Sequence, residues 1–304
     1  MINRHGLART IPQDIKLDVR RRSKFGCVIC RGLICEYEHI DPPFSDASAH
    51  DPDRICLLCP THHAEVTRGL LSKQQVLSAY RRVQENSNIR PPHYNLKLSG
   101  RSLDIEIGAA LFDCTSVPTD LILIDGHSLL SVGFLQETIS EVPVLSLSAQ
   151  IFDQAGRPLL RIIDNELTFS DGLHDIRTQG SKISIFTTKG RYGAQIEIRR
   201  SNAIRLTRLN MSFGGCLLHL DEQFAVTLPL SGCRAVTLGM KRLQASGVKC
   251  AIEYIRPDPL PDQLGDISIV GGEGATICNS GLTLAKGAGQ MLIPELAVWE
   301  HQAK

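Results

Sequence analysis

The spacing of hydrophobic residues divides the chain into a first part with helical patterns and a second part with strand patterns. Residues 72–85 predict an amphipathic helix with Ser72 as its N-cap, since hydrophobic residues recur three or four positions apart. The hydrophobic positions on this face are Val76, Leu77, Tyr80 and Val83. Residues 63–70 also predict a helix, whereas residues 15–20 suit either a short strand or the start of a helix.

Beyond residue 92 the hydrophobic positions alternate with a period of two, which is typical of strands that bury one face. The clearest alternating segments are residues 103–107, 145–151, 182–186, 194–198 and 204–206. No segment after Glu85 has the pattern of a long helix. We therefore predict an all-β domain over residues 96–304. Residues 86–95 form the predicted linker, because this stretch is polar and contains two consecutive prolines.

The all-β domain has two candidate architectures. The Gly-rich stretch 271–284 predicts very short strands separated by Gly and Asn turns, a pattern typical of the rungs of a parallel β-solenoid. A β-sandwich is the alternative, since no repeat is strict enough to decide for the solenoid.

Composition narrows the class of protein. With 42% hydrophobic and 21% charged residues, the 304-residue chain has the balance of an ordinary globular protein, which excludes wholesale disorder. It has no apolar stretch of the roughly 18 to 20 residues that span a membrane and no apolar leader, so we expect a cytoplasmic protein without a membrane partner. The net charge of +1 hides an asymmetry, because residues 1–91 carry 14 Lys and Arg against 10 Asp and Glu.

Five of the ten cysteines fall within residues 27–59, and two pairs of residues there have the spacing of metal ligands. Cys27 and Cys30 form a Cys-x₂-Cys pair, and Cys59 and His62 form a Cys-x₂-His pair. Four nitrogen and sulfur ligands on two short loops are what a tetrahedral Zn²⁺ requires. Reduced, buried cysteines are the alternative, but two such pairs in a reducing compartment favour a structural zinc site.

A second pattern lies between and after these pairs, with Glu38-His39-Ile40 in the middle and His63 directly after the last zinc ligand. Taken in order, Cys-x₂-Cys, Glu-His-Ile and Leu-Leu-Cys-x₂-His-His resemble the HNH endonucleases with a ββα-metal fold. The resemblance covers residues 21–70 only. It implies an α+β protein, in which a small zinc-stabilised ββα-metal nuclease module over residues 1–85 precedes the all-β domain.

The resemblance also implies a role for each matching residue. His39 corresponds to the general base that deprotonates the attacking water, while Glu38 and His63 correspond to ligands of a catalytic divalent ion. The separate structural zinc corresponds to Cys27, Cys30, Cys59 and His62. The expected cofactors are therefore Zn²⁺ in the structural site and Mg²⁺ or Mn²⁺ in the catalytic site.

The residue types suit this chemistry independently of the resemblance. Hydrolysis of a phosphodiester needs an activated water and a cation at the phosphate, and little else. An imidazole with an ordinary pKa of about 6.5 accepts a proton near neutral pH. An ion held by one carboxylate and one imidazole keeps most coordination positions open for water and phosphate oxygens. Considered alone, Glu38 and His39 would instead suit a solvated pair on a loop.

One position departs from the HNH pattern. Arg54 stands where the family has an asparagine that braces the loop, so Arg54 either takes over this role or contacts phosphate. His50 is a weaker candidate for the site. Basic residues ahead of the first cysteine pair favour a polyanionic partner, which we expect to be DNA. The candidate phosphate contacts are Arg20, Arg21, Arg22, Lys24 and Arg54, with Arg68 as a weaker one.

The main hypothesis is a metal-dependent DNA endonuclease, such as a bacterial restriction or phage-defence nuclease, whose β-rich domain serves recognition, regulation or oligomerisation. One alternative is a zinc-stabilised nucleic-acid-binding protein with a decayed catalytic site. Another is a sensor whose β-rich domain releases the nuclease when a ligand or protein partner binds. We expect a homo-oligomer, since a symmetric dimer is the simplest way to pair two cutting sites.

Overall fold

The structure is a computed structural model that describes most of the first 220 residues and separate strands beyond them. The described residues are 2–96, 98, 102–108, 110–115, 119–135, 144–170, 172–200, 202–220, 224–229, 234–241, 244–246, 250–254, 269–271, 275–278, 281–284, 290–292 and 295–302. The chain divides into two compact units, each with its own internal contacts. The first unit is Met1–Asn95 with Thr168–Thr178, and the second is Leu96–Leu167 with Gln179–Lys304.

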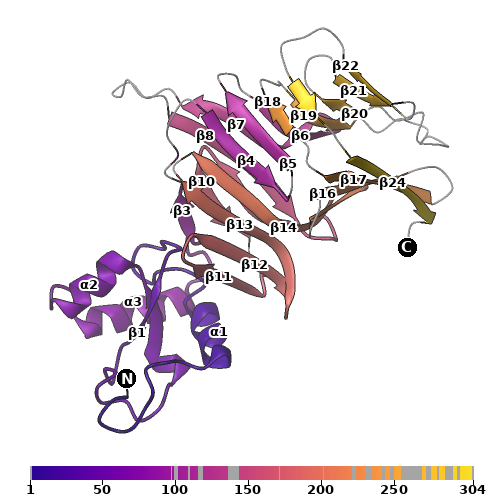
Figure 1. The fold of residues 1–304 in the computed structure, drawn as a ribbon. Coiled ribbons are helices and arrows are strands. Elements are labelled where there is room, and N and C mark those ends of the chain that lie inside the picture. The colour runs from indigo at the N-terminus through magenta and orange to yellow at the C-terminus, as the bar shows by residue number, and fades with distance from the viewer. Residues whose placement is uncertain are drawn as a thin grey trace. The chain divides into compact units, whose positions relative to one another are not determined.

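The described part of residues 2–95 groups its helices around a short antiparallel hairpin (Figure 1). In chain order the elements are α1 (Gln13–Arg22), β1 (Glu36–His39), the 3₁₀ helix η1 (Pro52–Arg54), β2 (Ile55–Leu58), α2 (Pro60–Thr67), α3 (Lys73–Glu85) and β3 (His93–Asn95). Strand β1 pairs with β2, and α2 begins directly after β2. The histidines at the start of α2 are therefore carried by the same local structure as the end of the hairpin.

The hairpin is held between two apolar clusters, one on each face of β2. All four residues of β2 are buried. Its alternate side chains face opposite ways, as the strand period requires. Cys56 and Leu58 pack with Tyr80 of α3, while Ile55 and Leu57 pack with Val19 of α1. Because both faces of β2 are covered, the strand is hydrophobic throughout and does not alternate.

The helices follow local sequence signals. The prediction of a helix over residues 72–85 is confirmed: the Ser72 hydroxyl accepts the N–H of Gln75, and the Gln75 side chain caps the Ser72 N–H in return. Residues 15–20 lie in helix α1, whose C-terminal turn carries three arginines that complement the helix dipole. The predicted helix over residues 63–70 corresponds to α2, which starts earlier because Pro60 favours the first helical position.

Strands make up the second unit in its described parts. The strands that lie in it wholly or partly are β4 (Ser102–Ile107), β5 (Ala110–Thr115), β6 (Thr119–Ile124), β7 (His127–Leu135), β8 (Val144–Phe152), β9 (Pro158–Ile163), β10 (Glu166–Phe169), β11 (Asp175–Gln179), β12 (Lys182–Thr188), β13 (Arg191–Arg200), β14 (Ala203–Phe213), β15 (Cys216–Leu220), β16 (Phe224–Pro229), β17 (Arg234–Lys241), β18 (Gln244–Ser246), β19 (Cys250–Tyr254), β20 (Ile269–Gly271), β21 (Ala275–Cys278), β22 (Gly281–Leu284), β23 (Gln290–Leu292) and β24 (Glu295–Gln302). All five segments predicted from their alternation lie in strands, namely β4, β8, β12, β13 and β14.

Most described neighbours in this unit pair antiparallel. Strands β6 to β9 form one meander, and β12 to β17 with β24 form another. Parallel pairs join β4 to β14, β5 to β18 and β6 to β19. The β-solenoid interpretation is therefore wrong for the described strands, because β20, β21 and β22 also pair antiparallel. A connection of two or three residues can join only antiparallel neighbours, because parallel neighbours need long crossovers. The connections themselves, residues 272–274 and 279–280, lie outside the described residues.

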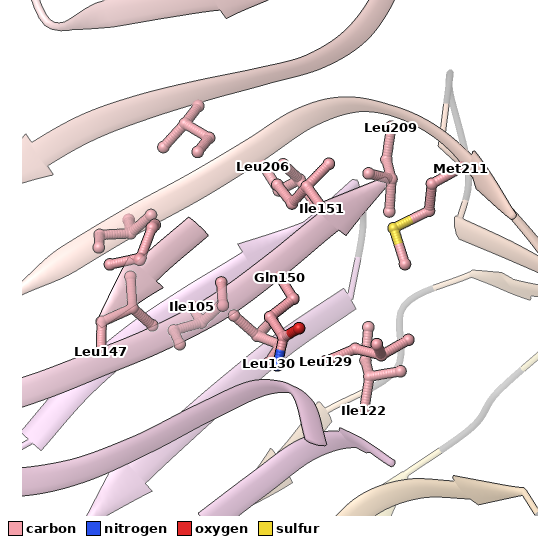
Figure 2. Close-up of a pocket in the computed structure, with 14 residues that line it drawn as sticks. Ile105, Ile122, Leu129, Leu130, Leu147, Gln150, Ile151, Leu206, Leu209 and Met211 are labelled. Carbon is pink, nitrogen blue, oxygen red and sulfur yellow. The ribbon is translucent and has the colours of Figure 1, made fainter. Parts of the chain in front are cut away.

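The described strands of the second unit lie in two sheets, one with β6 to β9 and the other with β4, β5 and β12 to β17. The two sheets face each other across an apolar layer, in agreement with the sandwich interpretation. Figure 2 shows a pocket in this layer that both sheets line. One sheet contributes Ile105, Ile204 and Leu206, and the other contributes Ile122 and Leu147. These side chains are part of the described core of the second unit.

The boundary of the first unit differs from the sequence-based prediction in two ways. Residues 86–95 belong to the first unit, where the backbone oxygen of Arg90 accepts the Nε–H of Arg31 at 3.1 Å. Segment 168–178 also belongs to it, although more than 70 residues of the second unit precede it in the chain. The predicted module of residues 1–85 is thus incomplete without these segments. Among the described residues, no helix has both the length and the apolar composition needed to cross a membrane.

Candidate metal centre and catalytic site

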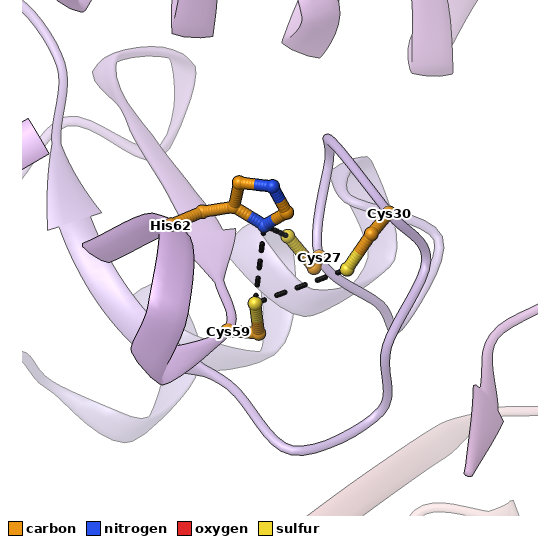
Figure 3. A group of neighbouring side chains, drawn as sticks. All are labelled: Cys27, Cys30, Cys59 and His62. Carbon is orange, nitrogen blue, oxygen red and sulfur yellow. Dashed lines mark hydrogen bonds between the residues drawn. The ribbon is translucent and has the colours of Figure 1, made fainter. Parts of the chain in front are cut away.

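Four side chains converge between the first cysteine loop and the start of α2 (Figure 3). Their ligand atoms all lie within 4.8 Å of one another. Nδ1 of His62 is 3.1 Å from Sγ of Cys59 and 3.5 Å from Sγ of Cys27, and the sulfurs of Cys30 and Cys59 are 3.8 Å apart. Among the described residues, this is the one group of three or more such donors gathered so closely.

The Cys30–Cys59 and Cys27–His62 distances match the edges of a tetrahedral metal site, and the Cys59–His62 distance is shorter than such an edge. Bonds of about 2.3 Å to sulfur and about 2.0 Å to nitrogen place two sulfurs roughly 3.8 Å apart and a sulfur and a nitrogen roughly 3.5 Å apart. A disulfide between Cys30 and Cys59 is excluded, since it would need sulfurs about 2.05 Å apart. The group could therefore hold a metal ion such as zinc, as its sequence spacing predicts.

A buried arginine, not predicted from the sequence, organises the loop that carries the first cysteine pair. Arg31 is 5% exposed, and its guanidinium donates to the backbone oxygens of Ser23 at 2.9 Å and Lys24 at 2.6 Å. A side chain at Gly26 would meet the carbonyl oxygen of Arg31 at 3.0 Å, so this loop also requires glycine. The buried cation satisfies carbonyl groups that the tight loop leaves without partners.

The two consecutive histidines of α2 serve different groups. His62 directs Nδ1 toward the cysteines, while its Nε2 faces a carboxylate oxygen of Glu65 at 4.0 Å. His63 directs Nε2 toward Oε2 of Glu38 at 3.0 Å and Nδ1 toward Oε2 of Glu36 at 3.5 Å. Successive helical side chains diverge by about 100°, which accounts for the separation.

Glu38 contacts two other side chains of the candidate catalytic group, His63 and Lys73. Its side chain is only 13% exposed, and its two carboxylate oxygens face different partners. One faces Nε2 of His63, and the other contacts the ammonium group of Lys73, the first residue of α3. Lys73 also contacts the backbone oxygen of His39. Glu36 and Lys73 were not predicted from the sequence, although the period of a strand places Glu36 and Glu38 on the same face.

His39 follows Glu38 in β1, but its ring turns toward a different set of residues. Nε2 of His39 is 3.1 Å from Nδ1 of His50, and Phe44 packs beside both rings. In the described residues the ring of His39 makes no hydrogen bond to Glu38 or His63. Burial lowers the pKa of His39 to about 4, with the charge of His50 as the second cause. His39 is therefore neutral at pH 7, the form that can accept a proton.

Arg54 braces the loop between β1 and η1. Its guanidinium donates to the backbone oxygen of Asp41 at 3.0 Å and lies 3.5 Å from a carboxylate oxygen of Asp51. Its own backbone oxygen accepts the N–H of Ile40 at 2.8 Å. Of the two interpretations offered for Arg54, these contacts support the brace. The side chain is 55% exposed, so phosphate contact stays a prediction.

Arg20 was predicted to contact phosphate, and this prediction is wrong. The side chain is buried, with Nε 2.7 Å from Oδ1 of Asp175 and a terminal nitrogen 2.8 Å from Oδ2. Another terminal nitrogen donates to the hydroxyl of Tyr37 at 2.6 Å. No local sequence pattern could predict the contact between Arg20 and Asp175, because Asp175 lies 155 residues further along the chain.

Of the remaining basic residues of this run, Arg21 and Arg22 are exposed and Lys24 is partly buried, and all three make contacts within the first unit. Arg21 contacts His174 and Arg22 contacts Asp53. Nζ of Lys24 donates to the backbone oxygen of Asn86 at 2.5 Å. Each would have to exchange such a contact for phosphate, so their role as phosphate contacts stays a prediction. Arg68 is exposed and follows α2 directly.

Comparison with known proteins gives no family assignment. No known protein family, no curated protein and no solved structure matches this chain. The resemblance to HNH endonucleases therefore rests on the sequence of residues 21–70 alone.

Proposed function

We propose that this protein is a metal-dependent endonuclease that hydrolyses phosphodiester bonds of DNA. The observation that carries the proposal is the approach of Glu38 and His63 to 3.0 Å, next to a buried and neutral His39. An antiparallel hairpin, a following helix and a Cys₃His group surround this arrangement. This is the order of parts that a ββα-metal nuclease has, with zinc as the structural metal.

The spacing of Glu38 and His63 suits a divalent cation. Two adjacent ligands of an octahedral ion with bonds of about 2.1 Å lie roughly 3.0 Å apart. The measured separation between Oε2 of Glu38 and Nε2 of His63 is 3.0 Å. A Mg²⁺ or Mn²⁺ ion held there would stabilise negative charge on the scissile phosphate and on the leaving oxygen.

The residues of the chain would then perform the remaining steps. His39, as the neutral base, takes one proton from the attacking water. The hydroxide oxygen forms a bond to phosphorus, the bond from phosphorus to the leaving oxygen breaks, and that oxygen takes a proton from solvent. Losing one positioned base costs on the order of 10² to 10⁴ in rate.

The test is cleavage of supercoiled plasmid by the full chain with Mg²⁺ or Mn²⁺, compared with a chelator control. His39→Ala should lose cleavage by the factor above while it keeps zinc and DNA binding. His219→Ala is the matched control, because His219 is exposed on β15 of the other unit. Cleavage by His39→Ala at the wild-type rate would show that His39 is not the base.

A zinc-stabilised nucleic-acid-binding protein without catalysis is the second candidate, and the contact between Lys73 and Glu38 favours it. The ammonium group supplies a positive charge at the carboxylate that a catalytic ion would use. Among the described residues, no third ligand atom joins Glu38 and His63 as closely as in the Cys₃His group. Binding of labelled duplex DNA without any cleavage in Mg²⁺ or Mn²⁺ would decide for this candidate.

We propose that the β-rich unit serves recognition, oligomerisation or regulation by a ligand or protein partner. A dimer would bring two cutting sites to one duplex. Light scattering that finds a strict monomer with full double-strand cleavage would contradict the dimer. Truncation near residue 95 is an unsuitable test, because it also removes Asp175, the partner of buried Arg20.

A further inference from the structure

His39 is joined to the N-terminal segment by a chain of two hydrogen bonds. Nε2 of His39 is 3.1 Å from Nδ1 of His50, and Nε2 of His50 is 2.9 Å from the backbone oxygen of Ala8. A backbone carbonyl can only accept a hydrogen bond, so Nε2 of His50 carries the hydrogen. In neutral His50 the other nitrogen, Nδ1, is then an acceptor.

The same logic assigns the proton on His39. Because Nδ1 of His50 accepts, Nε2 of His39 must donate and therefore carries the hydrogen. Nδ1 of His39 is left with its lone pair. This nitrogen makes no hydrogen bond to the described residues, yet it is not among their fully buried side-chain atoms that lack a partner. It therefore keeps access to solvent.

We infer that His50 is a positioning residue that holds His39 in the Nε2–H tautomer, so that Nδ1 of His39 takes the proton from water. The inference rests on the proposed function for its catalytic part only, since the tautomer follows from the hydrogen bonds. When Nδ1 accepts the proton, the Nε2–H of the imidazolium donates a charge-assisted bond to His50, which stabilises the charged product of the transfer.

The N-terminal segment holds His50 in place for this role. Nδ2 of Asn3 donates to the backbone oxygens of Phe44 at 2.6 Å and Ala47 at 2.7 Å. Arg4 pairs with Asp46 at 2.6 Å. The ring of Phe44 lies nearly parallel to that of His50, at an interplanar angle of 9°. Residues 3–8 thus belong to the support of the candidate site, although they lie far ahead of the cysteine pairs.

The tautomer can be measured without any cleavage assay. Nitrogen-15 NMR of histidine-labelled, zinc-loaded full chain separates protonated from unprotonated ring nitrogens, and the spectrum of His39→Gln identifies the signals of His39. At pH 7.5 without Mg²⁺ we expect His39 to carry its proton on Nε2. A proton on Nδ1, or an even mixture of the two tautomers, would overturn the inference.

Two variants test the functional consequence. His50→Leu removes the acceptor and should slow cleavage by about tenfold to a hundredfold, whereas His50→Asn keeps an acceptor near the position of Nδ1 and should recover most of the rate. Equal rates for His50→Leu and wild type would contradict the positioning role. If wild type does not cleave DNA at all, the proposed function fails, while the NMR result still decides the tautomer of His39.

Discussion

His62 and His63 are neighbours in α2, yet the side chain of His62 lies 3.1 Å from the Cys59 sulfur while that of His63 lies 3.0 Å from the Glu38 carboxylate. One helical step thus separates the candidate metal centre from the candidate catalytic group. The roles assigned to the two histidines from the sequence require this divergence, and the rotation of about 100° per helical residue accounts for it. The orientation of the two rings is consistent with those roles.

The first prediction separates the two histidines by phenotype. His62→Ala should lose bound zinc and unfold the first unit, because structural zinc contributes on the order of 10 kcal/mol to the folding of small metal modules. His63→Ala should retain zinc and fold, but lose cleavage and affinity for Mn²⁺. Elemental analysis, circular dichroism and Mn²⁺ titration measure these properties. Loss of zinc from His63→Ala would contradict the assignment.

The features that could be predicted are those that depend on residues close together in the sequence. The Cys₃His group follows from two x₂ spacings, and α3 follows from its apolar period and the cap at Ser72. Five strands of the second unit were predicted from alternation, and in β4 every second residue is buried, as that pattern requires. In the first unit, β2 could not be recognised by alternation, since all four of its residues are hydrophobic and buried.

The remaining parts could not be predicted, because their partners are distant in sequence or are backbone atoms. Asp175 reaches Arg20 across 155 residues, so no local pattern marks the pair. The acceptor for His50 is the backbone oxygen of Ala8, a group that every residue possesses. Arg31 is buried against backbone oxygens, whereas its charge alone predicts an exposed side chain.

The second prediction concerns the buried pair of Arg20 and Asp175. Asp175→Ala should destabilise the first unit by about 3 to 5 kcal/mol, since it leaves a buried guanidinium without its carboxylate. Arg22→Ala, which breaks an exposed pair with Asp53, is the control and should cost about 1 kcal/mol or less. Urea unfolding, monitored by the release of zinc, measures the free energy of unfolding of both variants. Equal effects would show that burial of the pair does not matter.

The third prediction concerns pH and the turn after β8. Burial alone would raise the pKa of Asp153, but hydrogen bonds from Arg157 and the Ala155 N–H outweigh it and lower the pKa below its ordinary value. The unfolded chain therefore takes up this proton at a higher pH than the folded chain. The stability that the carboxylate contributes is present above about pH 4 and is lost as the pH falls below that.

Carbon-13 titration of the Asp153 carboxyl group should thus give a midpoint below 3.8 in the folded protein. Asp153→Asn should lose about 1 to 2 kcal/mol at pH 7, because an amide accepts the backbone bonds but lacks the charge that binds Arg157. A midpoint at or above the ordinary value would contradict the lowered pKa.

The last prediction concerns Lys73, whose ammonium group contacts Glu38 at the point where a divalent cation would bind. A positive charge beside a cation site weakens cation binding through Coulomb repulsion. Lys73→Met removes the charge and keeps most of the aliphatic side chain, so Mn²⁺ should bind more tightly, by about threefold to tenfold.

Lys16→Met is the matched control, since Lys16 lies over the ring of Tyr37 and makes no contact with Glu38. Isothermal titration of Mn²⁺ into zinc-loaded protein gives the two affinities without a cleavage assay. Unchanged affinity in Lys73→Met would show that the cation and Lys73 do not share Glu38, and the catalytic ion would then have to bind elsewhere.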